Sequence, residues 1–349
     1  MNDLKMNDLK KNNLLQFNII KQKYDVKNTV IFIGNGNRDF GLRVAEYFPK
    51  CLSSMIPERF NDGEIKIPAI NENCRQKDCV IIQSCSYHPN FSINDLLMEV
   101  FIMIDTVKRS NAKTITVVLP IFPYQRQDRK SYSRSPITAS MVSTMLENSG
   151  INRVICFELH AGQIQGFFNK LPVDNLTINN YFIKCINNIS LEKSCDISDF
   201  VIVSPDEGGV KRASKLSKLI KSNMALIHKE RNKDNEVGEM VLMGNVNGKC
   251  CIIIDDMIDT GGTMIKACDV LRKNGADNIA IMVCHGILSK DAINKIRDCN
   301  SCDVVYVSNT VDVLSRVSEY GKIKIIDITE LCAAAIYKGI NGESVSELL

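Results

Sequence analysis

The segment DDMIDTGGT (residues 255–263) lies between the apolar run Cys251–Ile254 and the helical pattern MIKACDVLRKNG. A buried strand, a short polar turn and a helix in this order are typical of one repeat of an α/β sheet. The glycines allow the backbone to approach a ligand closely, and the amino end of the following helix favours an anion. Three aspartates, however, stand in or beside the turn. The anion must therefore carry groups that carboxylates also favour, such as hydroxyls or a metal ion.

Ribose 5-phosphate combines a phosphate, which suits the glycine-rich turn, with vicinal hydroxyls, which suit the aspartates. We expect its phosphate at the turn residues Thr260, Gly261, Gly262 and Thr263. Its 2- and 3-hydroxyls, or a Mg²⁺ ion on them, would meet the aspartates Asp255, Asp256 and Asp259. The alternative is a flexible acidic loop without a ligand. Two acids, a spacer and Asp-Thr-Gly-Gly-Thr between a strand and a helix form a more specific pattern than such a loop requires.

Apolar, β-branched runs like the one before this turn recur along the chain. A first series of predicted strands occupies residues 29–34, 79–84, 115–120 and 153–158. A second series occupies residues 200–205, 224–228, 250–255, 278–286, 302–308 and 323–327. Helical patterns lie between them at residues 95–108, 139–148, 210–221 and 263–274. Because apolar strands alternate with helices, the sequence predicts two α/β domains, each with a mostly parallel sheet flanked by helices.

The two series of strands meet near residues 172–180. We expect an amino-terminal domain at 29–175 and a carboxy-terminal domain at 176–349. The last ~20 residues of the chain would pack back on the amino-terminal domain. Residues 1–28 are rich in Asn and Lys, repeat MNDLK and lack the features of a signal or transit peptide, so they predict a disordered extension of a cytoplasmic protein.

Composition and charge exclude several classes of function. The formal net charge of +3 is too small and too dispersed to indicate nucleic-acid binding. No run of ~18 apolar residues is present, so the sequence predicts no membrane partner. Many of the 14 cysteines lie in apolar runs, which is typical of buried, reduced thiols inside cells. Cys299 and Cys302 form a single C-x-x-C pair without the second pair of a zinc site.

The acidic turn resembles the phosphoribosyl diphosphate fingerprint of the type I phosphoribosyltransferase fold. Across residues 29–349, six further motifs resemble the ribose-phosphate diphosphokinases: RFNDGEIKI (59–67), FPYQRQDRK (122–130), ELHAGQIQGFF (158–168), VSPDEGG (203–209), ALIHKER (225–231) and NGESVS (341–346). The resemblance implies two tandem phosphoribosyltransferase-like domains, the first for ATP and subunit contacts and the second for ribose 5-phosphate. It also implies a transferase of nucleotide biosynthesis that makes 5-phosphoribosyl 1-diphosphate and AMP.

An ATP site is expected on the loop FPYQRQD, where an aromatic, Pro-containing segment would hold Arg126 in place. A planar guanidinium stacks on adenine and pairs with phosphate oxygens. The resemblance implies that ATP is bound by Arg126, Gln127 and Asp128. A neighbouring subunit, within a homohexamer built from dimers, would complete the adenosine site with Phe60, Asp62 and Glu64.

The resemblance also assigns the chemistry. Two Mg²⁺ ions are implied, one at the ATP phosphates and one at the ribose, with the protein ligands His160, Asp206, Asp255 and Asp256. His160 would also contact ATP. Lys229 and Arg231 begin a polar stretch that could be a solvated face, but the resemblance makes them the cations that neutralise charge on the transferring group. No residue stands out as a general base.

A regulatory site between subunits is implied as well, with inorganic phosphate as a candidate activator. Its residues would be Arg134, Gln165, Asn175, Ser344 and Ser346. The sequence departs from the family at Tyr132, where a basic residue is usual, at Glu158, where Asp is usual, and at Gly162, where animal members often have Ser. Regulation by phosphate and by ADP is therefore open.

Two alternatives compete with this reading. A phosphoribosyltransferase that consumes the diphosphate would share the acidic turn, but it has no need of FPYQRQD or of a second domain of the same kind. A non-catalytic regulatory subunit of the same fold would be expected to lose key residues. The sequence retains His160, Asp206, Lys229 and Arg231 together with the whole acidic turn, which favours an enzyme.

Overall fold

The computed structural model describes residues 14–15, 23–229, 240–317 and 321–348. Within these residues the chain forms two compact units. The amino-terminal unit lies within residues 18–177, 310–312 and 328–349, and the carboxy-terminal unit lies within residues 1–17, 178–309 and 313–327. Each unit has a largely parallel sheet flanked by helices, which confirms the predicted fold class.

A five-stranded parallel sheet forms the centre of the amino-terminal unit. In spatial order its strands are β2 (Thr29–Ile33), β5 (Asp78–Ile82), β6 (Thr114–Leu119), β7 (Arg153–Phe157) and β8 (Val173–Leu176). The first four are the predicted apolar runs, and nearly all their side chains are buried because helices pack on both faces. β8 was not predicted, since its sequence VDNL lacks a continuous apolar run.

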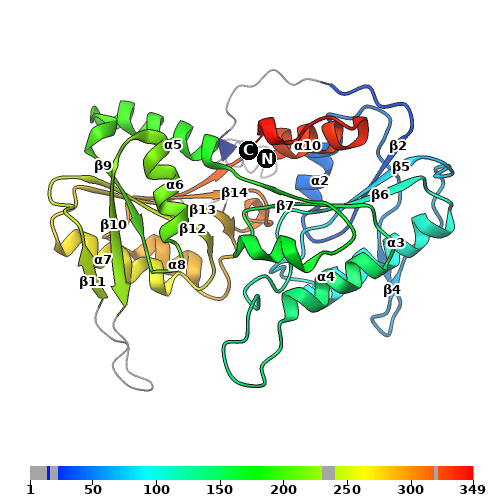
Figure 1. Ribbon diagram of the computed structural model, residues 1–349, viewed down its shortest axis with the longest axis horizontal. Helices are drawn as coiled ribbons and strands as arrows, with labels where there is room; N and C mark the ends of the chain where they lie inside the picture. The colour runs from blue at the N-terminus through cyan, green and yellow to red at the C-terminus, as the bar shows by residue number, and fades with distance from the viewer. Residues whose placement is uncertain (1–13, 16–22, 230–239, 318–320, 349) are drawn as a thin grey trace, which may run out of the picture. The chain divides into compact units, whose positions relative to one another are not determined.

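Helices cover both faces of this sheet (Figure 1). On one face lie α3 (Ile93–Arg109) and α4 (Thr138–Asn148), and on the other lie α2 (Arg38–Ala45) and α10 (Thr329–Asn341). Ser92 and Asp95 form a capping box that begins α3. The unit is completed by the hairpin of β3 (Glu58–Arg59) and β4 (Ile65–Lys66) and by short 3₁₀ turns at Gly162–Phe167 and Ser346–Leu348.

Two parts of the predicted amino-terminal extension, residues 14–15 and 23–28, belong to the described part of the chain. Leu14–Leu15 form β1, which pairs in parallel with β15 of the carboxy-terminal unit. Tyr24 is buried in the amino-terminal unit and stacks on Tyr337 of α10, with ring centroids 4.4 Å apart. The other residues before Lys23 lie outside the described residues. The sequence did not indicate these contacts because each depends on a partner far along the chain.

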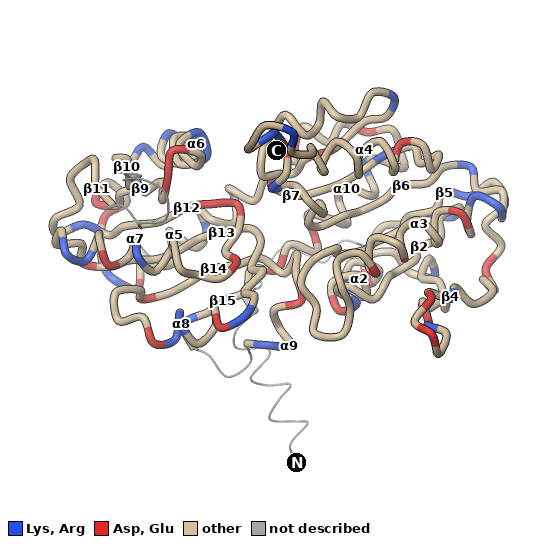
Figure 2. Tube along the Cα trace, turned by 90° about the horizontal axis from the view of Figure 1, so that it is seen from below, with Lys and Arg blue, Asp and Glu red and all other residues tan. Residues whose placement is uncertain are grey.

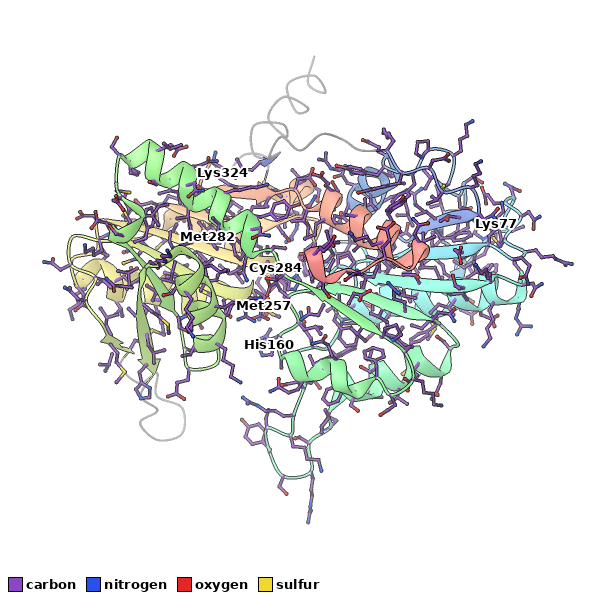
Figure 3. All side chains as sticks on the ribbon, turned by 45° about the horizontal axis from the view of Figure 1, so that its top comes forward. Lys77, His160, Met257, Met282, Cys284 and Lys324 are labelled. Carbon is purple, nitrogen blue, oxygen red and sulfur yellow. The ribbon has the colours of Figure 1, made fainter. Side chains whose placement is uncertain are left out.

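An eight-stranded sheet forms the centre of the carboxy-terminal unit, in the order β1-β15-β14-β13-β12-β9-β10-β11. Its strands are β1, β9 (Phe200–Ser204), β10 (Asn223–Lys229), β11 (Met240–Met243), β12 (Cys250–Ile258), β13 (Asn278–Gly286), β14 (Val304–Ser308) and β15 (Ile323–Ile326). β10 and β11 pair in antiparallel fashion, and the other described pairs are parallel. Met257 on β12 and Met282 and Cys284 on β13 belong to its buried core (Figure 3).

The path of the chain reverses direction between β9 and β12. From β9 it passes through α6 (Val210–Ile220) to β10 on one side, and from β12 it passes through α7 (Gly262–Lys273) to β13 on the other. Right-handed crossovers therefore place the two helices on opposite faces. Figures 1 and 2 show α7 and α8 (Ala292–Asp298) on the face away from α6. The other helical segments are α5 (Asn179–Lys193), α9 (Leu314–Val317) and a 3₁₀ turn at Ile197–Asp199.

Membrane association through a helix finds no support in the described part of the chain. None of its helices has both the length and the apolar character needed to cross a bilayer.

Candidate active site

The chain reverses direction between β9 and β12, so the sheet of the carboxy-terminal unit has a topological switch point there. In open α/β sheets, ligands bind at such a switch point, outside the carboxyl ends of the strands. Asp206 follows β9 by two residues, and Asp255 and Asp256 lie in the last part of β12. The topology thus brings the acids of two distant motifs to one edge of the sheet.

Asp255 and Asp256 lie inside β12, although the predicted strand ended at residue 255. The ladder to β9 stops at Ile253, whereas the ladder to β13 continues to Ile258. Pairing with the long strand β13 extends β12 beyond its apolar run. The edge of β12 that faces away from β13 therefore has no strand partner next to the two aspartates.

Arg212 of α6 contacts both aspartates. Its Nη1 atom lies 2.9 Å from Oδ1 of Asp255 and 3.5 Å from Oδ1 of Asp256, and all three side chains are largely buried. Burial, together with the neighbouring Asp256 charge, raises the pKa of Asp255 to about 8, and the Arg212 cation opposes that rise. The sequence showed Arg212 only as a cation early in a helix. Its role depends on how α6 packs beside β12, which no local pattern reveals.

The TGGT turn forms an open helix start. Gly261 adopts φ +77°, and no side chain caps α7, which begins at Gly262. A Cβ atom at Gly262 would meet nothing within 4 Å, so there is open space in front of the first turn. Thr260 and Thr263 are exposed on either side. First-turn N–H groups have no partner within their own helix, and an anion can accept from them.

Asp259 and Asp206 are held by local hydrogen bonds. The Ser289 hydroxyl donates to Oδ1 of Asp259, and the Ser289 backbone N–H donates to the Asp259 carbonyl at 3.1 Å. Asp259 therefore ties the turn to the segment after β13. The exposed Asp206 accepts from the Gly209 backbone N–H at 3.0 Å through one carboxylate oxygen. Its position at the start of α6 is fixed, and its other oxygen is not engaged by that bond.

Of the two cations predicted to be catalytic, Lys229 is the last described residue before residues 230–239, and Arg231 lies within those residues. Lys229 is the last residue of β10, and its backbone pairs with Met240 of β11. Arg231 lies outside the described residues, as does most of the polar stretch that follows it. One residue earlier, Nδ1 of His228 lies 2.8 Å from Oε1 of Glu207, which joins β10 to the loop after β9.

The predicted ATP loop in the amino-terminal unit follows β6. Arg126 and Gln127 are exposed and Asp128 is half-buried. Tyr124 adopts φ +59°, and the Gln127 N–H donates to its carbonyl at 2.9 Å, so the loop turns sharply. Thr138 at the start of α4 donates to Oε1 of Gln127 at 2.5 Å. These contacts hold the loop while leaving the Arg126 side chain at the surface.

Gln125 connects this loop to His160, and the sequence did not indicate it. Its Oε1 atom accepts from the backbone N–H of His160 at 3.0 Å, although the Gln125 side chain is only 2% exposed. The backbone N–H of the preceding residue, Leu159, donates to Oδ1 of Asn175 at 3.0 Å. Two side-chain amides therefore fix the backbone after β7, and the His160 side chain is exposed beyond them (Figure 3).

The three residues predicted to complete a neighbour's adenosine site lie on the turn of the β3–β4 hairpin. Phe60 is 52% exposed, and Lys66 Nζ lies 5.8 Å from its ring centroid. The Glu64 N–H donates to Asp62 Oδ1 at 3.1 Å, and the Phe60 N–H donates to the Glu64 carbonyl at 2.8 Å. The hairpin therefore presents a rigidly held, exposed aromatic ring.

A pocket of about 300 Å³ in the amino-terminal unit gathers part of the predicted regulatory set. It is lined by Arg153, Gln165, Val173, Asp174, Asn175, Leu176, Glu343, Val345 and Ser346. Ser344 lies next to it, where its hydroxyl accepts from the Ser346 N–H at 3.3 Å. Arg134 is exposed and is not among the lining residues. Burial raises the pKa of Asp174 even though Arg153 lies 3.2 Å away and opposes the rise.

No cluster of three or more His, Cys, Asp or Glu side chains among the described residues is arranged to hold a metal by itself. The pair Asp255 and Asp256 nevertheless offers the carboxylate oxygens that Mg²⁺ prefers. Mg²⁺ is usually held by one or two carboxylates plus substrate oxygens and water. Burial and the neighbouring Asp256 charge raise the pKa of Asp255 to about 8, and a bound cation would oppose both effects. The residues therefore fit a Mg²⁺ ion that is shared with a substrate.

Comparisons with known proteins agree on one family. Residues 29–150 match the model of the N-terminal domain of ribose phosphate pyrophosphokinase, and residues 235–349 match the phosphoribosyl synthetase-associated domain. Ribose-phosphate pyrophosphokinase A of Dictyostelium discoideum is 42% identical over 319 residues, covering 91% of this chain and 96% of that protein. The crystal structure of phosphoribosylpyrophosphate synthetase from Mycobacterium smegmatis superposes with a TM-score of 0.82 at 34% identity, covering 90% of this chain and 100% of that chain.

Proposed function

The chain belongs to the ribose-phosphate pyrophosphokinase family, and we propose below how its residues carry out the family reaction. The enzyme transfers the diphosphoryl group of ATP to ribose 5-phosphate, which yields 5-phosphoribosyl 1-diphosphate and AMP for nucleotide synthesis. The 1-hydroxyl of the sugar attacks the β-phosphorus, and AMP is the leaving group. Because both reactants already carry the reacting groups, the protein contributes alignment and charge neutralisation.

Ribose 5-phosphate binds at the switch point of the carboxy-terminal unit. The observation that carries this assignment is the open, uncapped start of α7 beside two buried carboxylates. The phosphate would accept hydrogen bonds from the N–H groups and hydroxyls of residues 260–263. The sugar hydroxyls would then meet Asp255 and Asp256, and Asp259 would fix the turn through Ser289.

Arg212 holds the two acids in the protein without substrate. It neutralises part of their charge at 2.9 and 3.5 Å, so the pair can stay buried before substrate arrives. Asp255 and Asp256 would hold a Mg²⁺ ion together with the ribose hydroxyls. Asp206 and His160 would serve a second Mg²⁺ at the ATP phosphates. When bound, these ions supply charge neutralisation on the phosphates and the hydroxyls.

ATP binds to the loop after β6 of the amino-terminal unit. The exposed Arg126 would stack on adenine or pair with phosphate, while Gln127 and Asp128 would donate or accept hydrogen bonds beside it. Phe60, Asp62 and Glu64 would come from the hairpin of a second copy. The exposed ring of Phe60 supports this arrangement, because a planar apolar surface in water gains by stacking on a base.

Lys229 and Arg231 supply positive charge to the transferring diphosphoryl group. This role is supported by the position of the two residues in the sequence. Lys229 ends β10 and Arg231 follows two residues later, and β10 pairs with β9, the strand that leads to Asp206. A positioned cation lowers the energy of the charged transition state and takes no part in covalent chemistry.

Regulation would act through the pocket at Gln165, Asn175 and Ser346, with Ser344 beside it and Arg134 reaching it from another copy within a homohexamer built from dimers. Inorganic phosphate is the candidate activator. Asn175 supports this role because it belongs to the pocket and also accepts from the backbone of Leu159, next to His160. An anion that moves Asn175 would therefore move the ATP-side loop. All 14 cysteines are free, which supports a reducing, cytoplasmic location.

Phosphorus NMR of the purified protein with ATP, ribose 5-phosphate and Mg²⁺ tests the proposal. We expect signals of AMP and of a sugar diphosphate without any added nucleobase, and a faster rate when inorganic phosphate is added. Absence of AMP from the purified protein would instead indicate a non-catalytic subunit. Product formation only when a nucleobase and the preformed diphosphate are supplied would indicate a phosphoribosyltransferase.

A further inference from the structure

Two cysteines meet at the amino-terminal end of β12, the end opposite to the acidic turn. Cys250 is the first residue of β12, and its thiol donates to Sγ of Cys195 across 3.6 Å. Cys195 follows Ser194, the C-cap residue of α5, which adopts φ 51°. The Cys195 N–H bonds back to the Ser190 carbonyl at 3.1 Å, which holds the cysteine in a turn at the end of the helix. The sulfur pair therefore links the α5–β9 connection to a central strand.

The two thiols differ in access to solvent. Cys195 is half-buried, so a small reagent can reach it, whereas Cys250 is 6% exposed and also accepts from Nδ2 of Asn278 at 3.7 Å. Burial, followed by the interaction with Cys195, raises the pKa of Cys250 to about 11, so Cys250 stays a thiol that donates to its neighbour. Because a reagent in solvent can reach Cys195 and not the buried Cys250, Cys195 is placed to be the nucleophile.

We propose that Cys195 and Cys250 form a modification site where a hydroperoxide converts the two thiols into a disulfide. The Cys195 thiolate attacks one peroxide oxygen, the O–O bond breaks, and the other oxygen leaves as hydroxide or alkoxide. The Cys250 sulfur then attacks the sulfenic sulfur of Cys195. The S–S bond forms, the S–O bond breaks, and the hydroxyl leaves as water with the Cys250 proton. Two thiols are oxidised, and one hydroperoxide is reduced to one alcohol and one water, or to two waters in the case of hydrogen peroxide.

The geometry requires only local movement. The sulfurs must approach from 3.6 Å to the ~2.05 Å of a disulfide. Rotation of the Cys195 side chain in its turn can supply much of this change. Other thiols of the unit lack the same access: Cys268 is 0% and Cys302 is 2% exposed. Cys251, the next residue of β12, is 1% exposed, and its sulfur is oriented toward the Lys249 carbonyl at 4.0 Å.

A disulfide here would close the chain from residue 195 to residue 250 into a loop that contains β9, α6, β10 and β11. Cross-linking such a long segment restricts the unfolded chain and stabilises the folded unit. Asp255 and the TGGT turn lie at the other end of β12 and are not touched by the bond. We therefore expect the oxidised enzyme to unfold at a higher temperature and to keep its catalytic site.

The test uses the full-length protein, oxidised with a small excess of hydrogen peroxide, alkylated under denaturing conditions and digested without reductant. Mass spectrometry should find a peptide pair linked through Cys195 and Cys250, and dithiothreitol should remove it. The unfolding temperature should rise by about 5 °C or more on oxidation and fall back on reduction. Cys251→Ser, the matched control on the same strand, should behave in the same way.

Cys195→Ser decides the proposal, because it changes a half-buried position in a turn and leaves the strand core intact. This variant should give neither the linked peptide nor the oxidation-dependent rise in unfolding temperature. A wild-type protein that shows no Cys195–Cys250 link after oxidation would overturn the proposal. The same temperature rise in Cys195→Ser would also overturn it, since the stabilisation would then come from another site.

Discussion

The two units both have a sheet whose strand order reverses direction once, but they differ in the residues at that switch point. In the carboxy-terminal unit, β9 lies between β10 and β12. In the amino-terminal unit, β2 lies between β5 and a single parallel bridge from Ile31 to Leu52. Both units therefore have a switch point, at β9/β12 and at β2/β5. The sheet order alone would allow a ligand at either of them.

At the switch point of the amino-terminal unit, polar side chains pair with one another and with the backbone. Glu99, which is 0% exposed, accepts from the Asn35 backbone at 3.1 Å, from the Asn35 amide at 2.9 Å and from the Gln83 amide at 2.7 Å. Gln83 in turn accepts from the Gly36 N–H at 2.8 Å. A Cβ atom added to Gly36 would lie 2.0 Å from the Ser84 carbonyl oxygen, so the two turns are in direct contact.

The first helices after the two switch points, α2 and α7, also differ in whether a side chain caps their amino-terminal end. Asn37 caps α2 by accepting from the Phe40 N–H at 3.2 Å, whereas no side chain caps α7. One switch point satisfies its polar groups internally, and the other leaves an open helix start beside two acids. We infer that the turn residues after the strands decide which switch point binds a ligand. Substitutions at equivalent places should therefore affect stability in one unit and substrate binding in the other.

Gly262→Val should have the largest effect on binding. A Cβ atom there would meet no protein atom within 4 Å, so the valine side chain would occupy the space assigned to the phosphate. We expect calorimetry to show no detectable binding of ribose 5-phosphate, while ATP still binds and the unfolding temperature is little changed. If the variant bound ribose 5-phosphate with unchanged affinity, the turn at residues 260–263 would not be the phosphate site, and the proposed difference between the two switch points would be wrong.

Lys229→Ala should lower kcat by at least ~10²-fold, by analogy with the loss of other transition-state charge donors. Lys249→Ala provides the matched control, because Lys249 pairs with Asp199 at 2.7 Å just before the other end of β12. Steady-state assays should show near-normal turnover for the control. Near-normal turnover for Lys229→Ala would mean that the catalytic charge does not come from the end of β10.

Sequence patterns predicted what is local in this molecule. The apolar runs located β2, β5, β6 and β7, and the Gly-Gly turn located the open start of α7. They could not show that β12 extends past residue 255, because that length depends on pairing with β13. Arg212 and Gln125 were missed for a similar reason: each acts across elements that only the folded chain brings together.

Gly36→Ala should give the opposite result to the change at Gly262. The added methyl group must displace the Ser84 backbone, and strain of this kind costs about 1–3 kcal/mol. Urea denaturation should show this loss in the free energy of unfolding. The Kd for ribose 5-phosphate should stay the same in the folded protein. A large loss of sugar-phosphate affinity without a stability loss would show that the amino-terminal switch point also binds this substrate.

The smallest effects are expected from substitutions at the amino-terminal ends of α2 and α7. Asn37→Ala removes the cap of α2 and should lower the free energy of unfolding by about 1 kcal/mol, with no change in substrate affinity. Thr260→Ala alters a residue beside an uncapped helix, so it should leave stability nearly unchanged and weaken ribose 5-phosphate binding. Denaturation and calorimetry on both variants separate the two roles. If Thr260→Ala were the more destabilising change, the hydroxyl would serve the fold, and the helix start of α7 would resemble that of α2 after all.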